Sequence, residues 1–238
     1  MSTHTQSCHW TYTVNEWQTD NFQNYLNIVF KDNDIKTIYD IGANVGGTAY
    51  TFLRYAQQHN KKINQIYCFE PDDENFNFMK KKINFINDNV NTKVDFIHKG
   101  IFYGKTTSKA YGIGTKESNK IHENVGGYLI DECAQKIVEN RNSNGEDVFC
   151  APVSDTKIFQ LDTLENLAKN FLLPDLIKID IEGSEKNLME NSTMLHHSKY
   201  IILEWNWNID LEKFLLKYLP SHKIIRRDCD VLLQKITK

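Results

Sequence analysis

The sequence lacks a cysteine pattern that would build a metal site or a disulfide framework. Its five cysteines, Cys8, Cys68, Cys133, Cys150 and Cys229, are scattered through 238 residues, and no two are separated by only two residues. Zinc knuckles and disulfide scaffolds need paired, regularly spaced cysteines, so neither is predicted. We therefore expect a reduced, cytoplasmic compartment.

Long apolar runs and a strong charge bias are also lacking. No apolar stretch approaches the ~18 residues of a membrane span, and the polar start MSTHTQSCHW differs from a secretory signal. The 28 basic and 31 acidic residues give a net charge of −3, which argues against a dedicated nucleic-acid binder. We expect a soluble protein with no membrane or nucleic-acid partner.

What the sequence does contain is an alternation of strand and helix patterns. Residues 36–41, 63–71 and 92–100 are typical of strands, and the segments 46–59 and 73–87 between them have helical periodicity. This βαβαβ order is typical of a parallel sheet with helical crossovers. We predict a single α/β domain with a Rossmann-like, mostly parallel sheet and helices on both faces.

Two segments interrupt this alternation. Residues 1–35 are predicted to be an N-terminal extension containing an amphipathic helix over 15–30. Residues 101–150 are predicted to be an insertion that covers the substrate, with a short hairpin near 106–114 and a helix at 129–140. Beyond the insertion, the patterns predict a helix at 161–171, a strand with a tight exit at 175–185 and a strand at 199–206. A helix at 210–220 and a terminal hairpin at 222–236 follow.

A glycine turn follows the first predicted strand in IYDIGANVGGTAYTF. A dinucleotide fingerprint would need a glycine at the position of Asn44, and its acid would lie about 20 residues further on. Here the acid that ends the second strand is Glu70, 28 residues after Gly42. A phosphate-binding loop would need a Lys-Ser or Lys-Thr pair at the start of the helix, and none is present.

S-adenosylmethionine suits this turn better, because it carries a sulfonium, an ammonium, a carboxylate and two ribose hydroxyls. The backbone N–H groups of the turn, at Gly42, Asn44 and Gly46, are expected to bind the carboxylate. Asp40 suits the ammonium, and Glu70 can accept hydrogen bonds from both ribose hydroxyls. The alternative for both acids is that they are ordinary strand-end residues.

Carboxylates also follow two later strands. In LIKIDIEG, Asp180 and Glu182 alternate with apolar residues, and Glu204 ends the next strand. We expect Asp180 near the cofactor's methionine and the reacting centre, with Glu182 and Glu204 around the acceptor, as a general base or orienting groups. These acids would also suit a divalent cation such as Mg²⁺. Glu182 has a structural alternative, because it would also cap a helix that begins at Gly183.

Three further residues are candidates for substrate contact. His98 ends the third strand, His122 lies in the insertion, and Trp205 follows the strand in IILEWN. Histidine titrates near neutral pH and an indole can stack on a sugar face. The alternatives are a solvent-facing histidine and a tryptophan packed in the core.

The motifs YDIGANVGGTAY, CFEPDDENF, FQLDTLENL, DLIKIDIEGSE and IILEWN, in this order, resemble the FkbM family of S-adenosylmethionine-dependent methyltransferases over residues 36–206. The resemblance implies a seven-stranded sheet with an antiparallel strand from the terminal hairpin. It also implies O-methylation of a hydroxyl on a sugar, a glycan or another small molecule. The match fades over 101–150, and the exit from the third strand, Lys99-Gly100-Ile101, departs from the family pattern.

Three other functions are weighed against an O-methyltransferase. A nicotinamide-dependent oxidoreductase is disfavoured by Asn44 and by the distance to Glu70. A nucleic-acid methyltransferase would carry an Asn-Pro-Pro-aromatic motif, which is absent from the sequence. A catalytically silent cofactor-binding module is disfavoured by the acids on two adjacent strand ends. The sequence does not indicate an oligomeric state.

Overall fold

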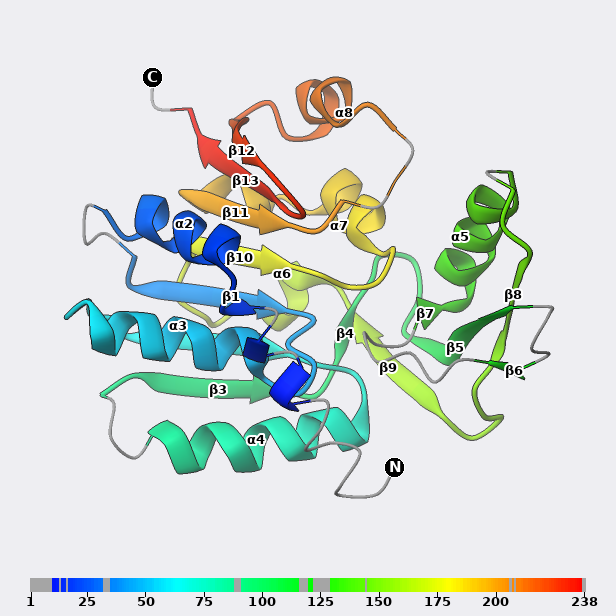
Figure 1. The fold of residues 1–238 in the computed structure, drawn as a ribbon, viewed down its shortest axis with the longest axis horizontal. Helices are drawn as coiled ribbons and strands as arrows, with labels where there is room; N and C mark the ends of the chain where they lie inside the picture. Colours follow the sequence, from blue (N-terminus) through cyan, green and yellow to red (C-terminus); the bar gives the residue numbers. More distant parts are fainter. Residues whose placement is uncertain are drawn as a thin grey trace.

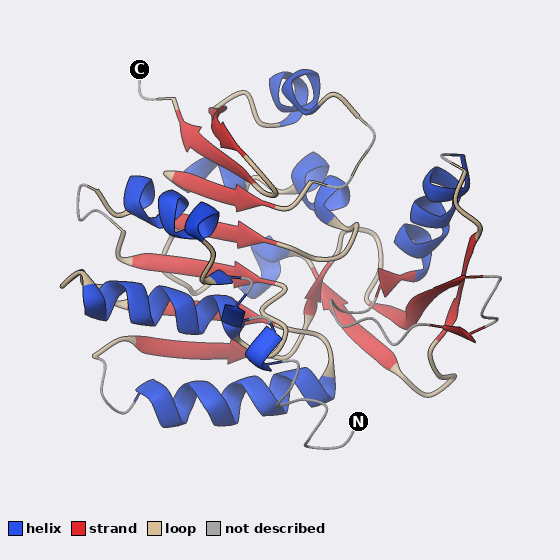
Figure 2. Ribbon diagram, viewed as in Figure 1, coloured by secondary structure: helices blue, strands red, loops and turns tan. Residues whose placement is uncertain are grey.

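A computed structural model describes residues 10–12, 14–15, 17–31, 35–87, 91–115, 120–121, 129–143, 145–205, 207 and 209–236. The described residues form a seven-stranded sheet and, at one edge of it, a smaller second sheet with its own helix (Figure 1). The carboxyl ends of the central strands point toward this second sheet. Figure 2 shows helices on both faces of the seven-stranded sheet.

The seven-stranded sheet is parallel except at one strand. In spatial order its strands are β12 (His222–Arg227), β13 (Val231–Lys235), β11 (Tyr200–Leu203), β10 (Leu176–Ile179), β1 (Thr37–Ile41), β2 (Gln65–Phe69) and β3 (Lys93–Ile97). β13 pairs antiparallel with both β11 and β12, and the pairings from β11 to β3 are parallel. The predicted fold class, including the antiparallel strand of the terminal hairpin, is confirmed.

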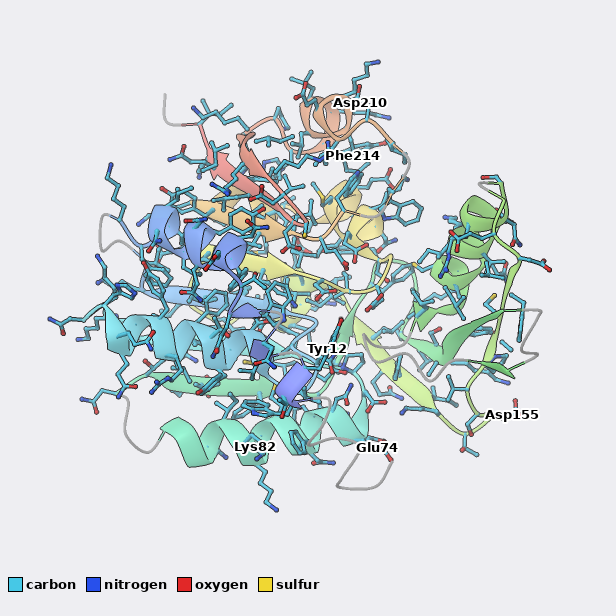
Figure 3. All side chains as sticks on the ribbon, viewed as in Figure 1. Tyr12, Glu74, Lys82, Asp155, Asp210 and Phe214 are labelled. Carbon is cyan, nitrogen blue, oxygen red and sulfur yellow. The ribbon has the colours of Figure 1, made fainter. Side chains whose placement is uncertain are left out.

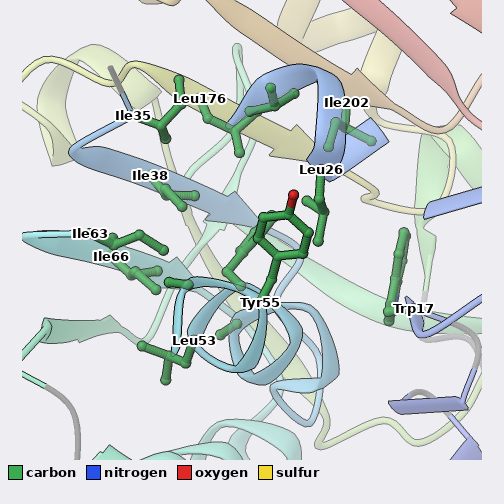
Figure 4. Close-up of a cluster of buried hydrophobic side chains, with 14 of the residues drawn as sticks. Trp17, Leu26, Ile35, Ile38, Leu53, Tyr55, Ile63, Ile66, Leu176 and Ile202 are labelled. Carbon is green, nitrogen blue, oxygen red and sulfur yellow. The ribbon is translucent and has the colours of Figure 1, made fainter. Parts of the chain in front are cut away.

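Alternate residues of the central strands supply two hydrophobic cores. On one face, Ile38 and Leu176 pack with Leu53 and Tyr55 of α3 (Figure 4). On the other face, side chains such as Ile177 pack with α7 and α8. Strands covered on both faces are continuously apolar, which is why β1, β2 and β10 are buried along their whole length.

The helices divide between these two faces. The first face carries α2 (Asp20–Val29), α3 (Gly47–Gln58) and α4 (Asp73–Asn87); the second carries α6 (Leu164–Leu167), α7 (Glu185–Asn191), the 3₁₀ helix η1 (Met194–His197) and α8 (Leu211–Tyr218). Side-chain caps fix several of these starts; for example, Thr163 accepts from the N–H of Asn166, and Asp210 accepts from those of Glu212 and Lys213. The helix predicted within 161–171, with Asp162 or Thr163 as its cap, begins as expected after Thr163, but it is only one turn long and ends at Leu167.

The second sheet replaces most of the loop predicted for the insertion. Its elements are β4 (Gly100–Ile101), β5 (Thr107–Thr115), β6 (Lys120–Ile121), β7 (Leu129–Ile130), α5 (Asp131–Ser143), β8 (Val148–Pro152) and β9 (Ile158–Asp162). The hairpin predicted near 106–114 is wrong, because this segment is one strand, β5, whose partners include β8 and β9. The helix predicted at 129–140 is confirmed as α5. In Figure 3, Asp155 marks the turn between β8 and β9, where it pairs with Lys109 at 2.7 Å.

No helix in the described ranges is long and apolar enough to cross a membrane.

Candidate functional site

The glycine turn lies at the carboxyl end of β1, in close contact with the neighbouring strand ends. Gly42 and Asn44 have φ values of +79° and +52°, which L side chains other than those of asparagine and aspartate rarely adopt. A Cβ at Gly42 would lie 1.8 Å from the backbone oxygen of Asp180. The N–H groups of Gly42 and Ala43 donate to Phe69 O at 3.1 and 3.0 Å. Only glycine allows this approach of three strand ends.

Glu70 is buried beside this turn. Its Oε2 accepts from the N–H of Asn44 at 2.7 Å and its Oε1 from the N–H of Asp72 at 2.9 Å. Burial raises the pKa of Glu70 to about 8, against the lowering effect of these backbone hydrogen bonds. Each carboxylate oxygen has a second lone pair, so Glu70 can still accept from a ligand.

Most amides of the turn donate within the protein. Besides the bonds to Phe69 and Glu70, the N–H of Gly46 donates to Ala43 O at 2.8 Å. The amides of Gly47 and Thr48 open α3, where the first N–H groups of a helix have no intrahelical acceptor. An anion at this turn is therefore expected to contact the start of α3, one step beyond the residues that the sequence suggested.

A buried lysine joins two of the predicted acids. The Nζ of Lys178 lies 3.1 Å from Asp180 Oδ2 and 3.7 Å from Asp40 Oδ1, and it donates to Gly42 O at 2.9 Å. Burial lowers the pKa of Lys178, but Asp180 and Asp40 outweigh this effect and the pKa is raised. Burial raises the pKa of Asp40 to about 6, while Lys178 opposes that shift. Lys178 thus fixes Asp40, Asp180 and the glycine turn relative to one another.

The turn after β10 presents Glu182 and is closed by an acid that sequence reasoning missed. Glu182 has a φ of +50°, and α7 starts later, with Ser184 as its N-cap. The carboxylate of Glu185 accepts from the N–H groups of Ile181 and Gly183 at 2.9 and 3.1 Å. The capping alternative for Glu182 is therefore not what the structure shows. Burial raises the pKa of Glu185 to about 7.

Three cavities lie along this edge of the seven-stranded sheet. Their volumes, open solvent included, are about 650, 420 and 630 Å³. The first cavity extends from Glu70 to the second sheet, the second lies against the glycine turn, and the third lies beside α2. The first and second share Gly42, Asn44, Asp180 and Glu182, and the second and third share Trp17, Asp180 and Glu204. Asp180, Glu182 and Glu204 are thus brought together, whereas Asp40 is buried beneath them.

The second sheet is fixed to this edge by polar and packing contacts. Lys157 Nζ lies 2.5 Å from Asp72 Oδ2. The other carboxylate oxygen, Asp72 Oδ1, accepts from the N–H groups of Glu74 and Asn75 at the start of α4. From α5, Ile137 reaches the exit turn so closely that a Cβ at Gly183 would lie 2.6 Å from its Cδ1. The insertion therefore borders the site through α5.

Two of the three candidate substrate residues, His98 and Trp205, do not line these cavities. His98 pairs with Asp73 at 3.0 Å and stacks on Phe76, away from the three cavities. Trp205 is 8% exposed and packs on Phe214 in the second core, which favours the core-packing alternative. His122 lies outside the described residues. Within the described part of the chain, no group of three or more His, Cys, Asp or Glu side chains is arranged to hold a metal ion.

The fold and the glycine turn define a class, the Rossmann-like methyltransferases. A structure of methyltransferase FkbM from Methylobacillus flagellatus KT superimposes with a TM-score of 0.53 at 14% identity, over 94% of this chain and 53% of that one. The sequence matches the model of the methyltransferase FkbM domain over residues 40–230. The chain belongs to the FkbM methyltransferase family, and it spans about half the length of the Methylobacillus protein.

Other solved methyltransferases are more distant. TrmK from M. capricolum, in complex with S-adenosyl-homocysteine, gives a TM-score of 0.42 at 14% identity, over 88% of this chain and 67% of that one. Podospora anserina PaMTH1, also bound to S-adenosyl-homocysteine, gives 0.43 at 12% identity, over 98% and 88%. No curated protein matches the sequence.

Proposed function

We propose that this methyltransferase uses S-adenosylmethionine to methylate a hydroxyl of a sugar, a glycan or another small molecule. The observation that supports this most directly is the chain of three adjoining cavities, with Glu70 at one end and Asp180 and Glu204 where the second and third meet. A nicotinamide-dependent oxidoreductase or a silent binding module is the alternative.

The residues present fit the cofactor. Gly42 and Asn44 of the turn line both the first and the second cavity, and Glu70 offers buried acceptor oxygens for the ribose hydroxyls. The amides at the start of α3 suit the carboxylate. Carboxylates line the second cavity, where a sulfonium and an ammonium are attracted. S-adenosylmethionine, when bound, supplies an electrophilic methyl group.

The chain's own contribution is to orient the acceptor hydroxyl and to remove its proton. Asp180 is held by its ion pair with Lys178, so it suits an orienting role. Glu204 follows β11 and lines both the second and third cavities, so it suits the general base that accepts the hydroxyl proton. Alignment of the reacting atoms supplies much of the rate.

Calorimetry with S-adenosylmethionine and with NAD⁺ tests the proposed cofactor. We expect binding of the first alone, and preferential binding of NAD⁺ would contradict the proposal. Glu204→Gln is expected to lower turnover by about 100-fold or more, with the dissociation constant for S-adenosylmethionine nearly unchanged. Equal losses of binding and turnover would show that Glu204 acts structurally.

A further inference from the structure

The described residues that line the third cavity all lie outside the insertion. It is bordered by α2 and by the turn between β12 and β13, through residues such as Trp17, Asn21 and Asp230. The insertion instead reaches the first cavity through Ile101 and Ile130, and β9 of the second sheet lines that cavity too. The second sheet therefore covers the end of the site where Glu70 lies.

The order of the cavities separates donor from acceptor. The first and second cavities share Gly42 and Asn44 in their walls, so a cofactor that extends from Glu70 to α3 would pass along this turn. The second and third meet at Asp180 and Glu204. The carboxylates proposed for the hydroxyl thus lie where the two cavities adjoin, and an acceptor in the third cavity would approach them from the side opposite Glu70.

Trp17 forms the wall between these two cavities. Trp17 is 8% exposed. The Phe22 ring packs edge-on against it, with 4.7 Å between the ring centres, and Lys178 Nζ lies 5.0 Å from the centre of the Trp17 ring. A cation above an indole ring is attracted to it, and the contact helps to hold the ring in place. Trp17 therefore presents a small, fixed part of its ring to the third cavity, while most of the ring packs in the first core.

The charges of the third cavity select among acceptors. Asp180, Glu204 and Asp230 line it, and no lysine or arginine does so among the described residues. A pyranose presents an apolar face that packs on an aromatic ring and hydroxyls that donate to carboxylates. A uronic acid or sugar phosphate would instead be repelled by Glu204 and Asp230, since Asp180 is already paired with Lys178.

We propose that the third cavity is the acceptor site, that it takes an uncharged sugar, and that Trp17, Asn21 and Asp230 set this specificity. The proposal rests on the proposed O-methyltransferase function. It assigns acceptor choice to the N-terminal segment and the β12–β13 turn, and it assigns the second sheet to the cofactor end.

A steric test uses two exposed asparagines of α2. Asn21 lines the third cavity, and Asn24 lies one helical turn further along and does not. With neutral methyl glycosides of common hexoses as acceptors, Asn21→Trp is expected to raise the acceptor KM at least about tenfold. Asn24→Trp should leave it unchanged. Calorimetry should show both variants binding S-adenosylmethionine like the wild type.

A charge test uses Asp230→Asn, which removes one charge and preserves the side-chain shape. We expect the wild type to prefer neutral glycosides over the matching uronides by at least about tenfold in kcat/KM. Asp230→Asn should reduce this ratio severalfold, a change that a merely structural role would not produce. Trp17→Ala should raise the acceptor KM, and Trp17→Phe should restore most of it.

The outcomes separate the two proposals. Absence of S-adenosylmethionine binding would contradict the proposed function itself. Binding of S-adenosylmethionine without methylation of any neutral glycoside would overturn the sugar class. Methylation that is unaffected by Asn21→Trp, or an unchanged ratio of neutral to anionic acceptors in Asp230→Asn, would overturn the assignment of the third cavity.

Discussion

Lys178 is the residue on which the geometry of the site depends most. Its side chain is 2% exposed and touches Asp40, Asp180 and the backbone of Gly42, so one ammonium joins β1, β10 and the glycine turn. A buried charge is tolerated only when opposite charges and acceptors surround it. The alternation in LIKIDIEG predicted a role for Asp180 and Glu182. The lysine that precedes them, Lys178, holds Asp40 and Asp180 in place.

Lys178→Met is predicted to destabilise the fold by about 3–5 kcal/mol, because it leaves Asp40 buried without its partner. Lys199→Met is the control, since Lys199 pairs with Asp175 at 3.2 Å but is 46% exposed, and exposed pairs contribute about 0–1 kcal/mol. Urea unfolding measures both. The loss in Lys178→Met should shrink as the pH falls, because a protonated Asp40 carries no charge. Equal effects of the two variants would contradict this role.

Glu70 should make cofactor binding depend on pH. Burial raises the pKa of Glu70 to about 8 in the folded protein, from about 4.5 in the unfolded chain. Its contribution to the stability of the fold is therefore full below about pH 4.5 and is lost as the pH rises to about 8. Ribose hydroxyls that donate to Glu70 favour its ionised form. Affinity for S-adenosylmethionine is therefore predicted to rise between about pH 6 and pH 8, by up to about tenfold per unit.

Calorimetry across this range checks the prediction, with Glu70→Gln as the control. The amide cannot ionise, so the slope should disappear in this variant while binding weakens. A wild-type affinity with the same pH dependence as Glu70→Gln would show that Glu70 does not bind the ribose in ionised form.

At the scale of elements, the site is a set of turns that pack on one another. The turn after β1 contacts the backbone after β10, and the turn after β10 contacts α5. Glycines occupy both contact points because a Cβ would clash there. Each turn therefore depends on an element that is distant in sequence.

Gly42→Ala is predicted to destabilise the protein more than Gly104→Ala. Both glycines have positive φ, +79° and +100°, so both variants incur about 1–2 kcal/mol of backbone strain. The alanine at 42 would also lie 1.8 Å from Asp180 O, whereas nothing lies within 4 Å at Gly104. Thermal unfolding with and without S-adenosylmethionine compares the two variants. An equal loss of stability in both would show that the contact of Gly42 with Asp180 does not contribute to stability.

The sequence predicted those elements whose pattern is local. Apolar runs such as those of β1 and β2, each followed by a helix, identified the parallel sheet, and the acids at 180, 182 and 204 were correctly expected to meet at its edge. The second sheet was missed because the partners of β5 lie far along the chain, as in the pair Thr107 and Gln160. Lys178 and Glu185 have roles that only burial and contact reveal.

At the scale of the whole molecule, polar contacts such as the ion pairs of Lys157 with Asp72 and of Lys99 with Asp162 join the two sheets. The pair of Lys157 and Asp72 is the most buried of the ion pairs described between them, with side chains 21% and 3% exposed. Because Asp72 also caps α4, the pair connects the β8–β9 connection of the second sheet to the end of β2, near Glu70.

Lys157→Met is predicted to loosen the second sheet without unfolding the first. Hydrogen exchange should become faster in β5 and β8, while exchange in β1 and β10 should stay slow. Lys109→Met is the control, because Lys109 pairs with Asp155 at an exposed turn. Faster exchange throughout the seven-stranded sheet would show that the two sheets unfold as one unit.

The position of β13 between β11 and β12 has a consequence for how the chain is made. β12 joins the sheet only through β13, which is translated after it. A nascent chain on the ribosome can therefore assemble β3, β2, β1, β10 and β11 while β12 still has no neighbour, and the sheet is completed only once residues 231–235 leave the exit tunnel.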